Sequence, residues 1–132
     1  MQVRTTRFGT VEIAEDRVIC FPKGLLGFSE FRKYCLLEPA EDSAFFWLQS
    51  LDFVVTDPSF FVPDYSVPIR SEQMGDLGLS RLEDAQVFVI VNKVDQTLTA
   101  NLQGPLVINT LTRTGEQMVL AEKKWHTRHP LV

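Results

Sequence analysis

The chain has 132 residues, of which 45% are hydrophobic, and a formal net charge of −4. A chain of this size and composition suits one domain, spanning residues 1–132, with a single hydrophobic core. Its longest apolar runs are too short to cross a bilayer or to form the core of a signal peptide, so we expect a cytoplasmic protein with no membrane partner.

Short runs with alternating or β-branched side chains recur between turn signals, a pattern typical of an antiparallel all-β domain. In chain order, strands are predicted at Met1–Thr5, Thr10–Ile13, Arg17–Phe21, Tyr34–Leu37, Phe45–Ser50, Phe60–Val62, Gln86–Val94, Thr97–Leu102, Leu106–Leu111 and Gln117–Leu120. Many short strands in a small domain favour a barrel-like sheet, because closure removes exposed edges. An open sandwich is the alternative.

Helix is predicted to be scarce. Ser71 can cap a short helix through Leu77 that ends at Gly78. Single helical turns are possible at Ser80–Glu83 and at Ser29–Lys33.

Turn signals join the later strands and interrupt the middle of the chain. Asp95-Gln96 and Thr114-Gly115 predict tight connections, so the C-terminal half is expected to form consecutive hairpins. Pro58, Pro63 and Pro68 predict an irregular, partly extended surface segment between the two halves.

Negative charge is concentrated in the middle of the chain. Residues 38–84 carry ten acidic side chains against two basic ones, a net charge of −8, whereas each flanking segment carries +2. Nucleic-acid binding usually needs a basic surface that neutralises phosphates, so we expect no direct contact with RNA or DNA. A basic protein partner is favoured, although each acid taken singly also fits a solvated loop or helix face.

Catalytic chemistry has little support in the sequence. His126 and His129 lie without a neighbouring Cys or carboxylate at ligand spacing, which is too few ligands for a closed zinc site. No nucleophile motif, phosphate-binding loop or dinucleotide fingerprint is present. Cys20 and Cys35 sit in apolar, strand-like settings without CxxC spacing and are interpreted as buried structural thiols. We therefore expect no catalytic residue, no metal and no cofactor, in a protein that is not an enzyme.

Aromatic side chains are frequent, with ten Phe, two Trp and two Tyr. Base stacking would need neighbouring Lys or Arg, whereas Phe45-Phe46-Trp47 and Phe60-Phe61 are flanked by acids. Most of the rings are predicted to be core, and the others are candidates for a protein-binding surface.

Two motifs place Gly and Pro inside apolar runs, where an ordinary strand would have neither. They are Phe21-Pro22-Lys23-Gly24-Leu25-Leu26-Gly27-Phe28 and Asn101-Leu102-Gln103-Gly104-Pro105-Leu106-Val107-Ile108-Asn109. The amides of the second motif allow two interpretations. They satisfy main-chain groups that the break leaves unpaired, or the break exposes a sheet edge to which a partner segment adds by strand pairing.

With Phe46-Trp47-Leu48-Gln49-Ser50 and the aromatic run that ends at Tyr65, these motifs make the chain resemble the FliW family of flagellar assembly factors. The resemblance implies binding instead of catalysis. FliW proteins bind flagellin, in the manner of a chaperone, and also CsrA, a small dimeric RNA-binding repressor of flagellin translation. Free FliW keeps CsrA from the flagellin message, whereas accumulating flagellin occupies FliW and releases CsrA. An acidic segment would attract such a basic partner and repel RNA within a Debye length of about 10 Å.

The partner surface is predicted from the motif positions and from the charge pattern, in a chain expected to be monomeric when free. The predicted contacts are Phe28, Gln49, Phe61, Pro63, Asn101, Gln103 and Asn109, and the predicted sources of negative potential are Asp64, Glu72 and Asp76. Two alternatives are a small-ligand-binding β-barrel protein or enzyme with an aromatic-lined cavity, and a structural scaffold in a larger assembly.

Overall fold

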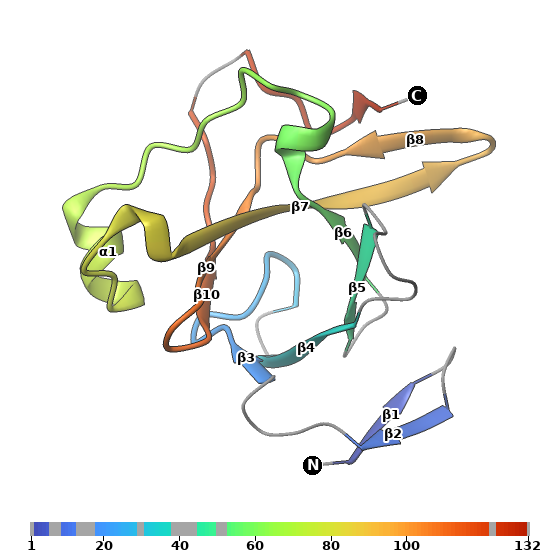
Figure 1. Ribbon diagram of the computed structural model, residues 1–132. Coiled ribbons are helices and arrows are strands. Elements are labelled where there is room, and N and C mark those ends of the chain that lie inside the picture. The colour runs from blue at the N-terminus through green and yellow to red at the C-terminus, as the bar shows by residue number, and fades with distance from the viewer. Residues whose placement is uncertain are drawn as a thin grey trace.

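The structure, a computed structural model, describes residues 2–5, 9–12, 18–28, 31–37, 45–49, 53–121 and 124–131. Strands β1 (Gln2–Thr5) and β2 (Gly9–Glu12) form a separate two-stranded sheet. The other nine strands form one strongly curled sheet (Figure 1). They are β3 (Val18–Cys20), β4 (Lys33–Leu37), β5 (Phe45–Gln49), β6 (Phe53–Thr56), β7 (Ala85–Val94), β8 (Thr97–Ala100), β9 (Leu106–Asn109), β10 (Thr114–Gln117) and β11 (His129–Pro130).

The long strand β7 organises this sheet. Its β-branched and aromatic residues suit a strand that is paired on both edges. Residues 91–94 pair with β8 and residues 85–88 pair with β9, while β6 pairs along residues 89–91. The N–H of Asn101 still donates to the carbonyl of Ile90, at 2.9 Å, so β8 and β9 follow the same edge of β7 as one interrupted strand. The break at residues 101–105 therefore lets β8 turn outward to β11 and β9 turn toward β10.

The pairings run in a circle. From β9 they pass to β10, then to β3 by a single parallel contact between Thr114 and Cys20, and through β4, β5 and β6 back to β7. All other pairings are antiparallel among the strands described. The prediction of a barrel-like, antiparallel all-β domain is confirmed, and the described strands do not form the alternative sandwich.

Buried side chains form three clusters. The first packs on the concave side of the sheet, and it includes Phe21, Tyr34, Leu48 and Phe88. The second packs around Trp125, and the third lies between the helical segment, strands β7 and β9, and Met118. Burying each large apolar side chain contributes roughly 1.5–3 kcal/mol, so these clusters hold the curled sheet together.

One strand prediction is wrong and two strands were not predicted. Phe60–Val62 is not a strand, because the Asp57 carboxylate accepts a hydrogen bond from Ser59 N–H at 2.9 Å and starts the 3₁₀ helix η2 (Pro58–Phe60). The missed strands are β6, which lies just before this cap and pairs with both β5 and β7, and β11, which pairs with β8.

The turn predicted at Thr114-Gly115 also lies elsewhere. Strand β9 ends at Asn109, and the following turn is completed by Arg113 in the left-handed region, with φ 57°. Because the turn comes early, β10 occupies residues 114–117 and not the predicted Gln117–Leu120. The Asp95-Gln96 turn between β7 and β8 is confirmed.

The short helix is confirmed at α1 (Ser71–Leu77), which ends at Gly78 in the left-handed region, with φ 67°. Its N-cap is Arg70, one residue before the predicted Ser71. The predicted turn after it is the 3₁₀ helix η3 (Leu82–Asp84). Of the turn predicted at Ser29–Lys33, the first residues lie outside the described part, and Lys33 begins β4.

Both cysteines are free. Cys35 is buried, and burial raises the pKa of its thiol, as expected for a structural cysteine. Cys20 is only half-buried, which differs from the prediction. Within the residues described, no helix has the length and apolar character needed to cross a membrane.

Candidate partner-binding surface

The first motif forms a loop that presents apolar side chains. Phe21 and Leu25 are buried and anchor it to the core. Gly24 and Gly27 have φ angles of 67° and 83°, which L side chains rarely adopt, so the two turns of this loop depend on glycine. Directly after the second anchor, Leu26 is 62% exposed, and the loop ends at Phe28, which is 39% exposed.

Lys23 connects this loop to two other elements. Its Nζ lies 2.7 Å from Oε1 of Glu116 in β10 and 3.3 Å from Oδ2 of Asp76 in α1. The hydrogen bond to Glu116, followed by that to Asp76, raises the pKa of Lys23. The pair with Asp76 is exposed, and exposed ion pairs add little to stability. Its effect is therefore to orient the loop relative to α1.

The second motif is held by its own amide side chains. Asn101 Oδ1 accepts hydrogen bonds from the N–H groups of Gln103, at 3.1 Å, and Gly104, at 3.0 Å. Asn109 is 2% exposed, and its Nδ2 donates to the Leu77 carbonyl at 2.9 Å. Its Oδ1 accepts from two N–H groups of the turn that follows β9. Asn101 and Asn109 therefore satisfy main-chain groups, which agrees with the first interpretation of this motif.

Gln117 joins the two motifs. Its Oε1 accepts from Leu26 N–H at 2.8 Å, and its Nε2 donates to the Gly104 carbonyl at 3.0 Å. A Cβ at Gly104 would lie 2.9 Å from Gln117 Nε2 and 3.0 Å from Asn101 Nδ2. Glycine at this position thus leaves room for the amides that couple the loop to the break.

The edge of the break itself is already paired. The carbonyls of Gln103 and Pro105 accept hydrogen bonds from the N–H groups of Leu120 and Met118, both at 2.8 Å. The second interpretation, in which a partner strand adds directly to the break, does not fit this arrangement, because residues 118–120 occupy that position.

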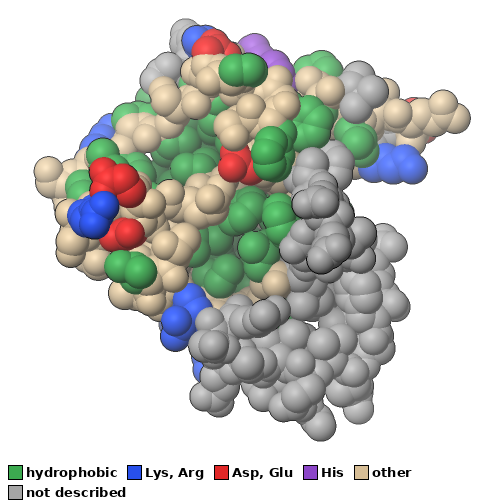
Figure 2. Space-filling model, in the orientation of Figure 1, with side chains coloured by type: hydrophobic (Ala, Val, Ile, Leu, Met, Phe, Trp, Pro, Cys, Tyr) green, Lys and Arg blue, Asp and Glu red, His purple; other side chains and the backbone are tan. Residues whose placement is uncertain are grey.

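The acidic segment is partly balanced by neighbouring bases. Asp64 Oδ2 lies 3.1 Å from Lys124 Nζ, and this hydrogen bond is the main reason why the pKa of Asp64 is lowered. Asp76 pairs with Lys23, whereas Glu72 is exposed in the first turn of α1. Figure 2 shows acidic and basic side chains next to each other near α1. The side chains of Glu38, Glu41, Asp42 and Asp52 lie outside the described residues.

The remaining predicted contact residues are spread over the fold. Pro63 is exposed, while Phe61 packs in part against the Trp125 cluster and Gln103 is half-buried. Gln49 ends β5, but its side chain lies outside the described part. Gln117 brings the loop and the break together, and this residue carries no motif signal in the sequence. Phe61 packs against the cluster that contains Leu102 of the break.

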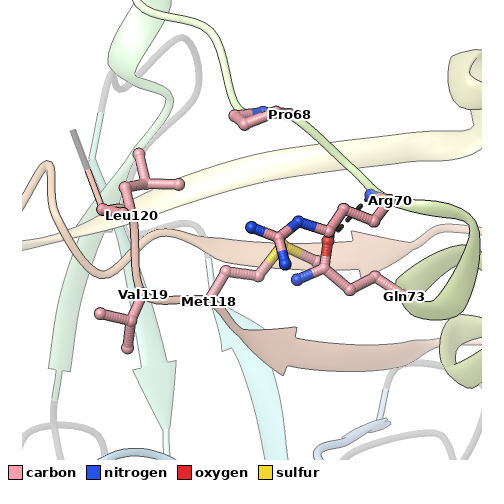
Figure 3. A pocket seen from close by; sticks show the side chains of 7 residues that line it. Pro68, Arg70, Gln73, Met118, Val119 and Leu120 are labelled. Atoms are coloured by element: carbon pink, nitrogen blue, oxygen red, sulfur yellow. Dashed lines mark hydrogen bonds between the residues drawn. The ribbon is translucent and has the colours of Figure 1, made fainter.

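A pocket of about 160 Å³ lies beside the loop and is lined by Lys23, Asp76 and Glu116 among others. Two larger pockets lie nearby. One, of about 310 Å³, lies on the concave side of the sheet, where Figure 2 shows apolar side chains gathered. It is lined by Ile19, Leu36, Phe88 and Ile108 and by the polar Gln86, Thr110 and Arg113. Phe88 is its single aromatic ring, so this pocket is not the aromatic-lined cavity of the alternative prediction. The other, of about 210 Å³, lies between α1 and the chain that follows β10 (Figure 3). Nowhere in the described residues do three metal-ligating side chains gather.

Comparison with known proteins gives consistent matches. Residues 2–131 match a family model described as FliW protein. A flagellar assembly factor FliW from Natranaerobius thermophilus is 37% identical, over 99% of this chain and 92% of that protein. Another from Treponema denticola is 39% identical, over 100% of this chain and 94% of that protein. A crystal structure of the flagellar assembly factor FliW aligns with a TM-score of 0.90 and 31% identity, covering 100% of this chain and 97% of that chain.

Proposed function

Because the chain belongs to the FliW family of flagellar assembly factors, we propose that it binds CsrA and flagellin alternately and thereby couples flagellin supply to flagellin translation. Free protein would hold CsrA away from the flagellin message, and flagellin would displace CsrA. The family match over residues 2–131 is the observation that carries this proposal. Both partners act in the cytoplasm in this scheme, where we place the protein.

The loop at residues 21–28 supports a protein-binding role. It exposes Leu26 and Phe28, and Lys23 of the same loop pairs with the acidic side chain of Asp76. Apolar side chains held on a glycine-defined loop can enter pockets of a partner, while nearby charges steer its approach. Glu72, on the same helix as Asp76, adds exposed negative potential.

Charge reversal tests the electrostatic part of this proposal. We expect Asp64→Lys with Glu72→Lys to weaken CsrA binding about tenfold at low salt, since loss of steering and like-charge contacts cost one to several kcal/mol. Flagellin binding should change less than about twofold. Calorimetric titration with each purified partner measures both values. Equal loss for the two partners in a variant with an unchanged circular dichroism spectrum would contradict the assignment.

A matched pair of isosteric variants separates local from general charge effects. Glu72→Gln and Asp95→Asn each remove one negative charge, but Asp95 lies in the turn between β7 and β8. Asparagine also tolerates the positive φ of 56° at that position. Only Glu72→Gln should reduce the salt-dependent part of CsrA binding. A calorimetric titration of CsrA into protein that already holds flagellin tests the switch. The heat of CsrA binding should then disappear.

The apolar pocket of about 310 Å³ is the one observation that favours a small-ligand carrier. Its size is at the lower end of the range of ligand sites, which is roughly 300–1,000 Å³. A thermal-shift screen with metabolites distinguishes the two functions. A specific shift, together with silence toward both CsrA and flagellin, would favour the carrier.

A further inference from the structure

The chain that follows β10 has one open edge. Met118 and Leu120 direct their N–H groups to the carbonyls of Pro105 and Gln103. Successive residues of an antiparallel strand bond to opposite sides, so the main-chain groups of Val119 and Ala121 face away from the break. Among the described residues, none bonds to the main chain of Val119 or Ala121.

A pocket of about 210 Å³ lies beside this edge, on the Met118 face of the sheet. Met118 packs there in the cluster under α1. In Figure 3, the side chains of Arg70 and Gln73 reach from the start of α1 toward Met118, while Leu120 and Val119 point to opposite sides. One side of the pocket is therefore polar and formed by Arg70 and Gln73, and the other side is formed by residues 118–121.

Arg70 supplies an unbalanced positive charge at this pocket. The ion pairs of the described residues involve Lys23, Arg81 and Lys124, and Arg70 has no carboxylate partner among them. Gln73 Oε1 instead accepts from the main-chain N–H of Arg70, at 2.9 Å, which fixes the Gln73 side chain beside residue 70 and leaves the guanidinium group out of this bond. A guanidinium group binds a carboxylate with two parallel hydrogen bonds.

We propose that an extended segment of a partner protein adds as a strand to Val119 and Ala121 and places an acidic side chain in this pocket against Arg70. Side chains of a strand alternate between its faces. An acidic residue directed to the Met118 face would enter the pocket, and its two neighbours would lie on the face of Val119, whose side chain is 66% exposed. The recognised pattern is therefore apolar, acidic, apolar. This inference rests on one part of the proposed function, namely that the chain binds other proteins.

Peptides of defined sequence test this site without any flagellar partner. The blocked peptide Ac-TVEVT-NH2 should produce saturable amide shifts at Val119 and Ala121 in a two-dimensional NMR titration. Ac-TVKVT-NH2, which differs only in charge, should bind at least tenfold more weakly. Equal shifts with both peptides, or no saturable shift with either, would overturn the proposal.

Variants of the protein locate the contact. Arg70→Gln should weaken binding of the acidic peptide about tenfold, because the charge-assisted hydrogen bonds to the carboxylate are lost, whereas the control Arg81→Gln should not. Val119→Pro removes the main-chain N–H that the added strand needs and should abolish peptide binding. Val119→Thr keeps this N–H and should preserve peptide binding. Peptide binding that survives Arg70→Gln would refute the carboxylate contact. Binding of CsrA without binding of the peptide would refute the proposed strand-addition site alone. Binding of the peptide without binding of CsrA or flagellin would refute the proposed function alone.

Discussion

The two motifs that interrupt apolar runs with Gly and Pro have opposite roles in the fold. The second, at residues 101–109, is largely buried, and its Asn side chains bond to main-chain groups. The first, at residues 21–28, is anchored by Phe21 and Leu25 but exposes the side chains between and after these anchors. Similar local composition therefore builds a structural joint in one place and a presenting loop in the other. What separates them is whether polar side chains are available to satisfy the main chain of the break.

This difference makes the effect of a substitution predictable from its position. Changes in the break should lower the free energy of unfolding, and changes at the tip of the loop should lower partner affinity without altering stability. Gln117 bonds to both the loop and the break, so a substitution there should lower both stability and partner affinity.

The largest loss of stability is expected for Asn109→Ala. The variant leaves the Leu77 carbonyl without its donor and removes the acceptor of the next turn, which should cost about 3 kcal/mol in the free energy of unfolding. Urea unfolding monitored by circular dichroism measures it. Asn92→Ala, at an exposed position on β7, should change stability by less than about 0.5 kcal/mol. Equal effects would show that the buried amide does not hold the joint.

Gly115→Ala should cause the second-largest loss of stability, because the added methyl group would clash with Phe21, which anchors the loop. A Cβ at Gly115 would lie 2.5 Å from Cε1 and 2.7 Å from Cζ of the buried Phe21 ring. Overpacking of this kind costs about 2 kcal/mol. Gly75→Ala is the control, since a Cβ there meets nothing within 4 Å and alanine favours helix by about 1 kcal/mol. The two melting temperatures should move in opposite directions.

Asn101→Ala should lower the free energy of unfolding by about 1 kcal/mol, because the N–H groups of half-buried Gln103 and buried Gly104 lose their shared acceptor. Thermal unfolding provides the measurement. Gln103→Ala serves as the comparison, since Gln103 enters this network through its main chain. An unchanged melting temperature with lost partner binding would move Asn101 from the joint to the partner surface.

The smallest effect on stability is expected for Leu26→Ser. Its side chain is exposed, so the free energy of unfolding should change by less than about 0.5 kcal/mol. Affinity for a partner that contacts the loop should fall about tenfold, the typical effect of losing an apolar contact worth 1–2 kcal/mol. Leu82→Ser, an exposed leucine in η3, is the control. Normal binding by Leu26→Ser to both partners would remove the loop from the proposed surface.

Several local features of the fold could be predicted from the sequence. Gly24 and Gly27 were predicted to interrupt an apolar run and Gly78 to end the helix, and all three adopt positive φ. The alternating run of β7 and the helix that ends at Gly78 were also predicted, because their signals lie within a few residues of one another. The short strand β6 was missed, although Val54 and Val55 are β-branched residues that favour a strand.

The candidate surface could be predicted only in part. Phe28 was selected from its motif, but Leu26, Gln117 and Arg70 were not. Leu26 and Gln117 bond to each other across the fold, and Arg70 lines a pocket with residues 118–121. The amide of Gln117 reaches a residue 91 positions away in the chain. No local pattern encodes such a contact.

The sequence by itself determined the family, the all-β class and the positions where the chain must turn, because composition, strand period and glycine placement act over short distances. Only the tertiary structure decided that β8 and β9 share one edge of β7, which of the two motifs is buried, and that the open edge lies at Val119 and Ala121 instead of at the break. Those outcomes depend on strand register, which is set by contacts between residues far apart in the chain.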